Sequence, residues 1–154
     1  MSDEVVLRPI GTVVGGRTEP VDDDWEGVEA TIALAERFDP EALQGLDDFS
    51  HLDVVYLFHR VGENKSVTGA RHPRGRSDWP RVGIFAQRAK ARPNRLGVST
   101  CRLLRVDGRT LHVADLDAID GTPVLDIKPY MAEMGPRTPV REPEWAKDLM
   151  RTYW

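Results

Sequence analysis

The chain has 154 residues, of which 40% are hydrophobic and 30% charged, and its formal net charge is −4. That length is typical of one domain, and a domain of this size can bury enough surface to fold without a disulfide or a structural metal. The single cysteine, Cys101, excludes an intrachain disulfide and zinc sites that need several thiolates. No apolar run approaches the ~18 residues of a membrane helix, and the acidic start at residues 1–4 does not resemble a signal peptide, so we expect a cytoplasmic protein.

Short strands dominate the first third of the chain. Residues 5–14 form a β-branched stretch that Pro9 and Gly11 interrupt, and residues 28–34 alternate apolar and polar side chains with a period of two. Residues 39–43 predict one capped helical turn, with proline at its first helical position.

Residues 51–59 form the most apolar predicted strand. Leu52, Val54, Tyr56 and Phe58 share one face, while the other face also carries apolar residues. Apolar side chains on both faces place this strand near the centre of the fold.

Three further strands are predicted at residues 83–86, 98–106 and 111–116, with a hairpin turn at Asp107-Gly108 between the last two. Only residues 143–153 have helical spacing. Six or seven short strands favour an all-β fold, either a small closed β-barrel or a sandwich, with a few short helices and a C-terminal helix. We expect a barrel domain over residues 1–140 and a helical tail over residues 141–154.

Charge is distributed unevenly along the chain. Residues 1–59 hold 14 acids and 3 bases, whereas residues 60–109 hold 3 acids and 13 bases, of which eleven are arginine. Two interpretations are open: the bases neutralise the acidic first third, or they form a face for an anionic ligand or RNA. Within this region, residues 62–82 are rich in glycine and proline and predict a long loop.

Several common sites are absent from the sequence. No glycine-rich dinucleotide motif follows a strand, and neither a phosphate loop nor a nucleophile elbow is present. His51 and His59 would lie ~26 Å apart along a strand at ~3.3 Å per residue, too far to share a metal. The acidic run at residues 22–24 is more typical of a solvated loop than of a cation site. We therefore predict no metal site.

Three segments are richer in functional residue types than packing requires: Phe49-Ser50-His51, residues 83–97 and residues 117–130. In the second, Arg88, Arg92 and Arg95 surround a Pro-Asn turn, which suits an anion but also fits a solvated hairpin. In the third, Asp126 and Lys128 share a strand face and can form a structural ion pair.

These segments resemble, in the same order, motifs of the TrmO (YaeB or TsaA-like) tRNA methyltransferase family, and the resemblance covers about residues 9–131. It implies a small β-barrel that binds S-adenosylmethionine and a homodimer with the cofactor near the interface. The implied reaction is N6-methylation of threonylcarbamoyl-adenosine beside the tRNA anticodon. The chain looks like a short form, without the additional C-terminal domain of longer members.

By motif match, the resemblance places the cofactor at Asp23, Asp24, Trp25, His59, Arg60, Arg88, Val98, Asp117, Ala118, Ile119 and Asp120. We expect the Arg88 guanidinium to pair with the cofactor's carboxylate, and Asp126 or Tyr130 to accept a proton or position the base. The expected RNA-binding residues are Arg71, Arg74, Arg92, Asn94, Arg95 and Lys128.

Three departures from the family pattern lie outside residues 117–130: Gln87 replaces threonine, Arg95 replaces proline and Asp53 replaces an aromatic residue. They leave the substrate open. The alternatives are a methyltransferase for another RNA or nucleoside, and a non-enzymatic module that binds S-adenosylmethionine or RNA.

Overall fold

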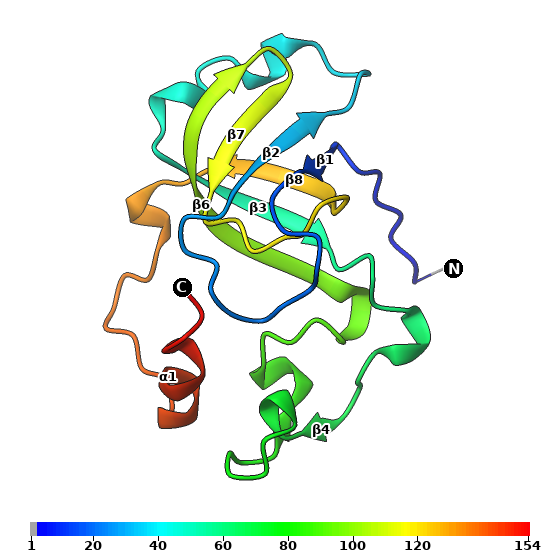
Figure 1. The fold of residues 1–154 in the computed structure, drawn as a ribbon, viewed down its shortest axis with the longest axis vertical. Coiled ribbons are helices and arrows are strands. Elements are labelled where there is room, and N and C mark those ends of the chain that lie inside the picture. The colour runs from blue at the N-terminus through cyan, green and yellow to red at the C-terminus, as the bar shows by residue number, and fades with distance from the viewer. Residues whose placement is uncertain (1–2) are drawn as a thin grey trace.

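The computed structural model describes residues 3–154, so Met1 and Ser2 of the acidic start lie outside the described residues. Six antiparallel strands close into a barrel in the order β1-β2-β7-β6-β3-β8 (Figure 1). The predicted all-β barrel is confirmed. Its strands are β1 (Gly11–Val14), β2 (Glu29–Leu34), β3 (His51–Leu57), β6 (Leu96–Asp107), β7 (Thr110–Ala114) and β8 (Pro123–Pro129).

The remaining elements are short. Strands β4 (Ala70–Arg71) and β5 (Val82–Gly83) form a separate two-stranded sheet, and one α-helix, α1 (Glu144–Met150), lies near the C-terminus. No helix within residues 3–154 is long and apolar enough to span a bilayer. The 3₁₀ turns are η1 (Pro40–Leu43), η2 (Leu46–Asp48), η3 (Glu63–Lys65), η4 (Pro73–Gly75), η5 (Ile84–Ala86), η6 (Pro93–Arg95) and η7 (Ala132–Met134).

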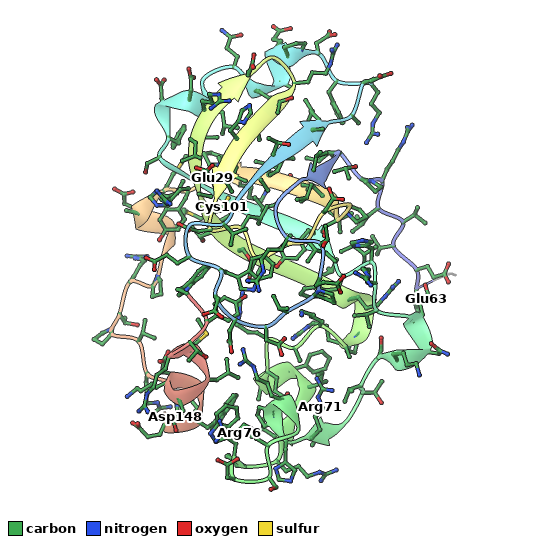
Figure 2. All side chains as sticks on the ribbon, viewed as in Figure 1. Glu29, Glu63, Arg71, Arg76, Cys101 and Asp148 are labelled. Atoms are coloured by element: carbon green, nitrogen blue, oxygen red, sulfur yellow. The ribbon has the colours of Figure 1, made fainter. Side chains whose placement is uncertain are left out.

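The barrel interior is filled by every second residue of its strands, as the pleat of a β-strand requires. In β3, Leu52, Val54 and Tyr56 are buried, which confirms the predicted inner face, and β3 pairs with both β6 and β8. Figure 2 shows Cys101 of β6 in this interior. The hairpin at Asp107-Gly108 is also confirmed, since Asp107 pairs with Thr110 and Gly108 has a φ of +59°.

Two predicted strands differ from the structure. The strand expected at residues 83–86 is wrong: only Val82–Gly83 pairs, and the chain then turns through η5, where the Gln87 N–H donates to the Ile84 carbonyl. The first strand begins at Gly11, not at residue 5. Pro9 has no N–H for a strand ladder, and Val5 and Val6 are exposed.

The predicted C-terminal helix is present but shorter than expected. It packs beside the segment that connects β4 to β5, where the Trp145 and Trp79 ring centroids are 6.5 Å apart. Figure 2 shows Asp148 of the helix near Arg76 of the same segment. The division at residue 140 stays a prediction.

Candidate functional site

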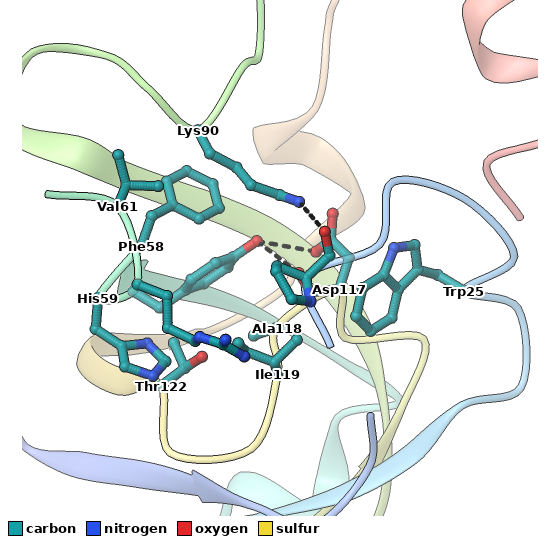
Figure 3. A pocket seen from close by; sticks show the side chains of 12 residues that line it. Trp25, Phe58, His59, Val61, Lys90, Asp117, Ala118, Ile119 and Thr122 are labelled. Carbon is teal, nitrogen blue, oxygen red and sulfur yellow. Dashed lines mark hydrogen bonds between the residues drawn. The ribbon is translucent and has the colours of Figure 1, made fainter. Parts of the chain in front are cut away.

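A small pocket opens at one end of the barrel, where β3 leaves the sheet and the connection between β7 and β8 crosses it (Figure 3). The pocket encloses about 40 Å³. Aromatic rings and one carboxylate dominate its wall. It is lined by Pro20, Trp25, Tyr56, Phe58, His59, Arg60, Val61, Lys90, Asp117, Ala118, Ile119 and Thr122.

A register shift in β3 helps to form the aromatic wall. The pairing of β3 with β8 slips between Val55 and Tyr56, and such bulges redirect side chains next to binding sites. The Tyr56 and Phe58 rings meet edge to face, with centroids 5.4 Å apart. Gly97 of β6 leaves room for both rings: a β-carbon there would lie 2.6 Å from Tyr56 Cζ and 2.9 Å from Phe58 Cζ.

Asp117 is the polar centre of the pocket. The Tyr56 hydroxyl lies 3.1 Å from its Oδ1, and the hydroxyls of Ser99 and Tyr153 also donate to its carboxylate. Burial, reinforced by the negative charge of Asp117, raises the pKa of Tyr56 well above its usual value. Tyr56 therefore remains a neutral donor at every physiological pH.

The connection after Asp117 forms the floor of the pocket. Ala118, Ile119 and Thr122 are buried, and the Thr122 N–H donates to the Ile119 carbonyl across a turn. Gly121 has a φ of +84°, which favours glycine because it has no β-carbon. His59 lies next to this turn (Figure 3), since a β-carbon on Gly121 would be 3.6 Å from its Nε2, and Arg60 also lines the pocket.

The loop before β2 supplies the opposite wall. Trp25 is 2% exposed, and the guanidinium of Arg17 lies 4.6 Å from the centroid of its ring. Lys90 joins this loop to the basic segment, since its Nζ donates to the Pro20 carbonyl and lies 3.3 Å from Asp22 Oδ1.

The C-terminal segment closes the pocket's edge. The N–H groups of Asp24 and Trp25 donate to the carbonyls of Thr152 and Tyr153 at 3.0 and 2.9 Å. These backbone bonds bring the Tyr153 hydroxyl to Asp117. No sequence pattern indicates this contact, because the spacing of residues 143–153 predicts only a helix.

Six of the eleven expected cofactor residues line this pocket; the other five do not. The Arg88 side chain donates to the Val98 carbonyl at 2.8 Å, on the outer side of β6. Asp120 Oδ1 accepts from the Gly15 N–H at 2.8 Å and so anchors the end of β1. The six that line it are Trp25, His59, Arg60, Asp117, Ala118 and Ile119.

Asp23 and Asp24 hold the loop instead of facing the pocket. The Asp23 carboxylate pairs with Arg74 and accepts from the Thr152 hydroxyl at 3.0 Å. The Arg74 hydrogen bond is the main reason that the pKa of Asp23 is lowered, and Thr152 adds to it. Asp24 has a φ of +64°, and its carbonyl accepts from Arg17.

The expected RNA-binding arginines are largely used inside the fold. Arg92 donates to the Gln87 carbonyl at 2.6 Å, Arg95 donates to the Val61 carbonyl, and Arg74 binds Asp23. Of these three side chains, only Arg74 pairs with an acid of the first third of the chain, which supports the self-pairing interpretation for that residue. Arg71 lies on β4, and Asn94 adopts a φ of +63° within η6.

The expected catalytic residues lie on β8 and just after it, away from the pocket lining. Asp126 pairs with Lys128 at 3.0 Å, as the shared strand face predicted. The Tyr130 N–H donates to the His51 carbonyl, and the Tyr130 and His51 rings meet edge to face with centroids 6.5 Å apart. Tyr130 therefore lies beside the His51 end of β3.

Six pocket residues are missing from the expected site: Pro20, Tyr56, Phe58, Val61, Lys90 and Thr122. The alternation in residues 51–59 assigned the two rings to the core, and Tyr56 is in fact both buried and part of the pocket. Lys90 was counted only within the basic region. No group of three or more potential metal ligands occurs within residues 3–154.

The chain has a closed barrel with a pocket at one end, in which aromatic rings surround a carboxylate. These features are typical of a β-barrel ligand-binding protein and not of a protein with a Rossmann-like fold. The chain belongs to the tRNA-methyltransferase O family, because the model of that family's N-terminal domain matches residues 20–135.

Relatives and solved structures agree with this membership. A probable S-adenosyl-L-methionine-binding protein of Pyrococcus abyssi is 36% identical over 89% of this chain and 74% of its own. The tRNA (adenine(37)-N6)-methyltransferase of Escherichia coli is 41% identical over 59% of this chain, but only 40% of the enzyme is covered. A crystal structure of TrmO from Pseudomonas aeruginosa superimposes with a TM-score of 0.72 at 30% identity, covering 90% of this chain and 61% of that one.

Proposed function

We propose that this protein is an S-adenosylmethionine-dependent methyltransferase that acts on the N6 position of adenosine in tRNA. The observation that carries the proposal is the Asp117 carboxylate, set among aromatic rings inside the segment that matches the family. The finer substrate we propose is threonylcarbamoyl-adenosine next to the tRNA anticodon, and we propose a cytoplasmic location for the protein.

The residues present fit this cofactor. S-adenosylmethionine carries a flat base, ribose hydroxyls, an amino-acid end and a cationic sulfur. Trp25 and Phe58 offer apolar faces to a base or a cation, and Asp117 accepts hydrogen bonds from hydroxyl or amino groups. Arg88, at the outer side of β6, is the proposed partner for the cofactor's carboxylate.

We also propose that a second copy of the chain completes the site. The enclosed volume of about 40 Å³ is far below the ~300–1,000 Å³ of a small-molecule site. Most of the cofactor would therefore lie outside the enclosed pocket, on the surface around its opening. Val98, whose carbonyl accepts from Arg88, is exposed, and so are Leu96 on the same strand and Phe85, three residues before Arg88. A homodimer that buries them would place the cofactor near the interface.

When bound, S-adenosylmethionine supplies an electrophilic methyl group, whose carbon–sulfur bond breaks with its electrons left on sulfur as a carbon–nitrogen bond forms to the acceptor. The chain's main task is to align the acceptor nitrogen, by holding both molecules in fixed orientation. The acceptor nitrogen also loses a proton, and we propose that Asp126 or Tyr130 accepts this proton or positions the base. Full turnover by both Asp126→Asn and Tyr130→Phe would remove them from that role.

Calorimetric titration with S-adenosylmethionine tests the cofactor, and transfer of a labelled methyl group to tRNA tests the reaction. We expect one site per chain and at least severalfold weaker binding by Arg88→Ala. Arg105→Ala is the control, because Arg105 pairs with His112 near the hairpin end of β6, away from Val98, which Arg88 contacts. Binding without methyl transfer to any RNA would favour the non-enzymatic module.

The salt dependence of RNA binding separates the substrate classes. Each phosphate contact releases counterions, so tRNA affinity should fall steeply as salt concentration rises. A nearly flat response would indicate a small nucleoside substrate.

A further inference from the structure

A second cavity, of about 230 Å³, lies on the outer side of the barrel next to the C-terminal segment. The pocket around Asp117 does not include any of its lining residues. It is lined by Glu26, His51, Thr100, Arg102, Asp115 and Trp154. Its volume is below the ~300–1,000 Å³ of a complete small-molecule site, which suits one planar base and not a whole nucleotide.

Two segments contribute to both cavities: the residues that follow β7 and the C-terminal residues. Asp115 and Asp117 follow the same strand, β7, with only the buried Leu116 between them. Tyr153 donates to Asp117 at the first pocket, and its ring meets the Trp154 ring edge to face with centroids 5.0 Å apart. The C-terminal segment thus contacts both cavities, through Tyr153 at Asp117 and through Trp154 in the second cavity.

Trp154 has the position of a binding residue and not of a core residue. Its side chain is 46% exposed, yet the backbone just before it is fixed by the bonds from Asp24 to Thr152 and from Trp25 to Tyr153. An aromatic face that is both exposed and held in place suits stacking with a base, because every base has a π-face.

The polar wall of the cavity offers both kinds of hydrogen-bonding partner. Asp115 accepts from Arg102 Nε at 2.7 Å and from the Gly27 N–H at 2.6 Å. Burial opposes ionisation of Asp115, but these two bonds outweigh it and lower its pKa, so the carboxylate stays charged. His51 Nδ1 lies 2.7 Å from Ser50 Oγ, and the hydrogen bonds of residues 3–154 leave its Nε2 for a ligand.

We propose that this cavity receives the base of the methyl acceptor, an aminopurine stacked on Trp154. The exocyclic amino group faces the carboxylates of Glu26 and Asp115, and a ring nitrogen faces His51 Nε2. The inference rests on the proposed methyl transfer and deepens it, because it assigns the acceptor to residues that the family resemblance did not select. Tyr130 lies beside His51 and would adjoin the acceptor.

The test is binding of an anticodon stem-loop RNA to Trp154→Ala, Trp154→Phe and a matched control, measured by fluorescence anisotropy. Met134→Ala is the control, because Met134 is 79% exposed and outside the cavity lining. We expect Trp154→Ala to weaken RNA binding at least ~5-fold, Trp154→Phe to keep most of the affinity and the control to match the wild type. Circular dichroism verifies that each variant is folded.

Titration with S-adenosylmethionine separates this inference from the proposed function. We expect Trp154→Ala to bind the cofactor as the wild type does. Unchanged RNA affinity in Trp154→Ala would overturn the inference, and so would a loss of cofactor affinity alone. Tighter cofactor binding by Tyr153→Phe would show that the cofactor displaces the C-terminal segment from Asp117. Trp154 would then not be held in place when the cofactor is bound, and this outcome would also overturn the inference. If the wild type bound no cofactor, the proposed function would fail, while the RNA titration would still decide on the cavity.

Discussion

A β-carbon on Gly97 would lie only 2.6 Å from Cε2 and Cζ of Tyr56, so the β6 backbone passes directly beneath that ring. Phe58 limits any escape, since its Cζ would be 2.9 Å away. The glycine is therefore a condition for the aromatic wall of the pocket and for the contact between Tyr56 and Asp117.

Gly97→Ala should both destabilise the protein and weaken cofactor binding. Forcing a methyl group into this packed position costs about 1–3 kcal/mol, and the displaced Tyr56 ring loses Asp117. Urea unfolding and calorimetry check the two effects, with Gly83→Ala as the control because a β-carbon there meets no atom within 4 Å. Equal behaviour of the two variants would contradict the packing argument.

Tyr56→Phe removes one hydroxyl from Asp117 and keeps the ring. Since Ser99 and Tyr153 still donate to the carboxylate, we expect a stability loss of only about 1 kcal/mol. Cofactor affinity should also fall, because the orientation of Asp117 becomes less fixed. Ser99→Ala is the matched variant on the same carboxylate. An affinity unchanged in both would show that Asp117 is positioned without them.

The ion pair between Arg74 and Asp23 should make stability depend on acid. The pKa of Asp23 is lowered, so its contribution is complete above the ordinary value of 3.8 and disappears as pH falls through the lower, folded value. We expect Arg74→Ala to cost roughly 1 kcal/mol near pH 7 and much less near pH 3. Urea unfolding at both pH values measures it. A cost that stayed constant would mean that Arg74 acts through packing.

Cys101 should be inert in the folded protein. Burial, together with the charge of Asp117, raises the pKa of its thiol to about 12, so only about one molecule in ten thousand carries the thiolate near pH 8. Iodoacetamide should leave the native chain unmodified and alkylate it fully in denaturant, as mass spectrometry can follow. Rapid alkylation of the native chain would show that the barrel opens readily at β6.

The barrel was predictable because its signal is local. The period of two in residues 28–34 and 51–59 follows directly from the pleat, and the Asp-Gly turn fixes the hairpin of β6 and β7. Residues 83–86 lack such a guide. There the buried Gln87 amide donates to the carbonyls of Arg71 and Val82, a long-range pairing that no local pattern indicates.

The candidate site was predictable only where motif and geometry coincide. Asp117, Ala118 and Ile119 lie in a contiguous motif and line the pocket together. Tyr153 could not be found in this way, because it reaches Asp117 from 36 residues further along the chain. Tyr56 was hidden by its own burial, since a strand's inner face looks the same whether it fills a core or forms a pocket.

The two backbone bonds between the loop before β2 and the C-terminal segment determine when the site can form during synthesis. Asp24 and Trp25 leave the ribosome early, but their carbonyl partners on Thr152 and Tyr153 are made more than a hundred residues later. A nascent chain can close the barrel before this wall exists. The contact between this loop and the C-terminal segment can therefore form only after Thr152 and Tyr153 have left the ribosome.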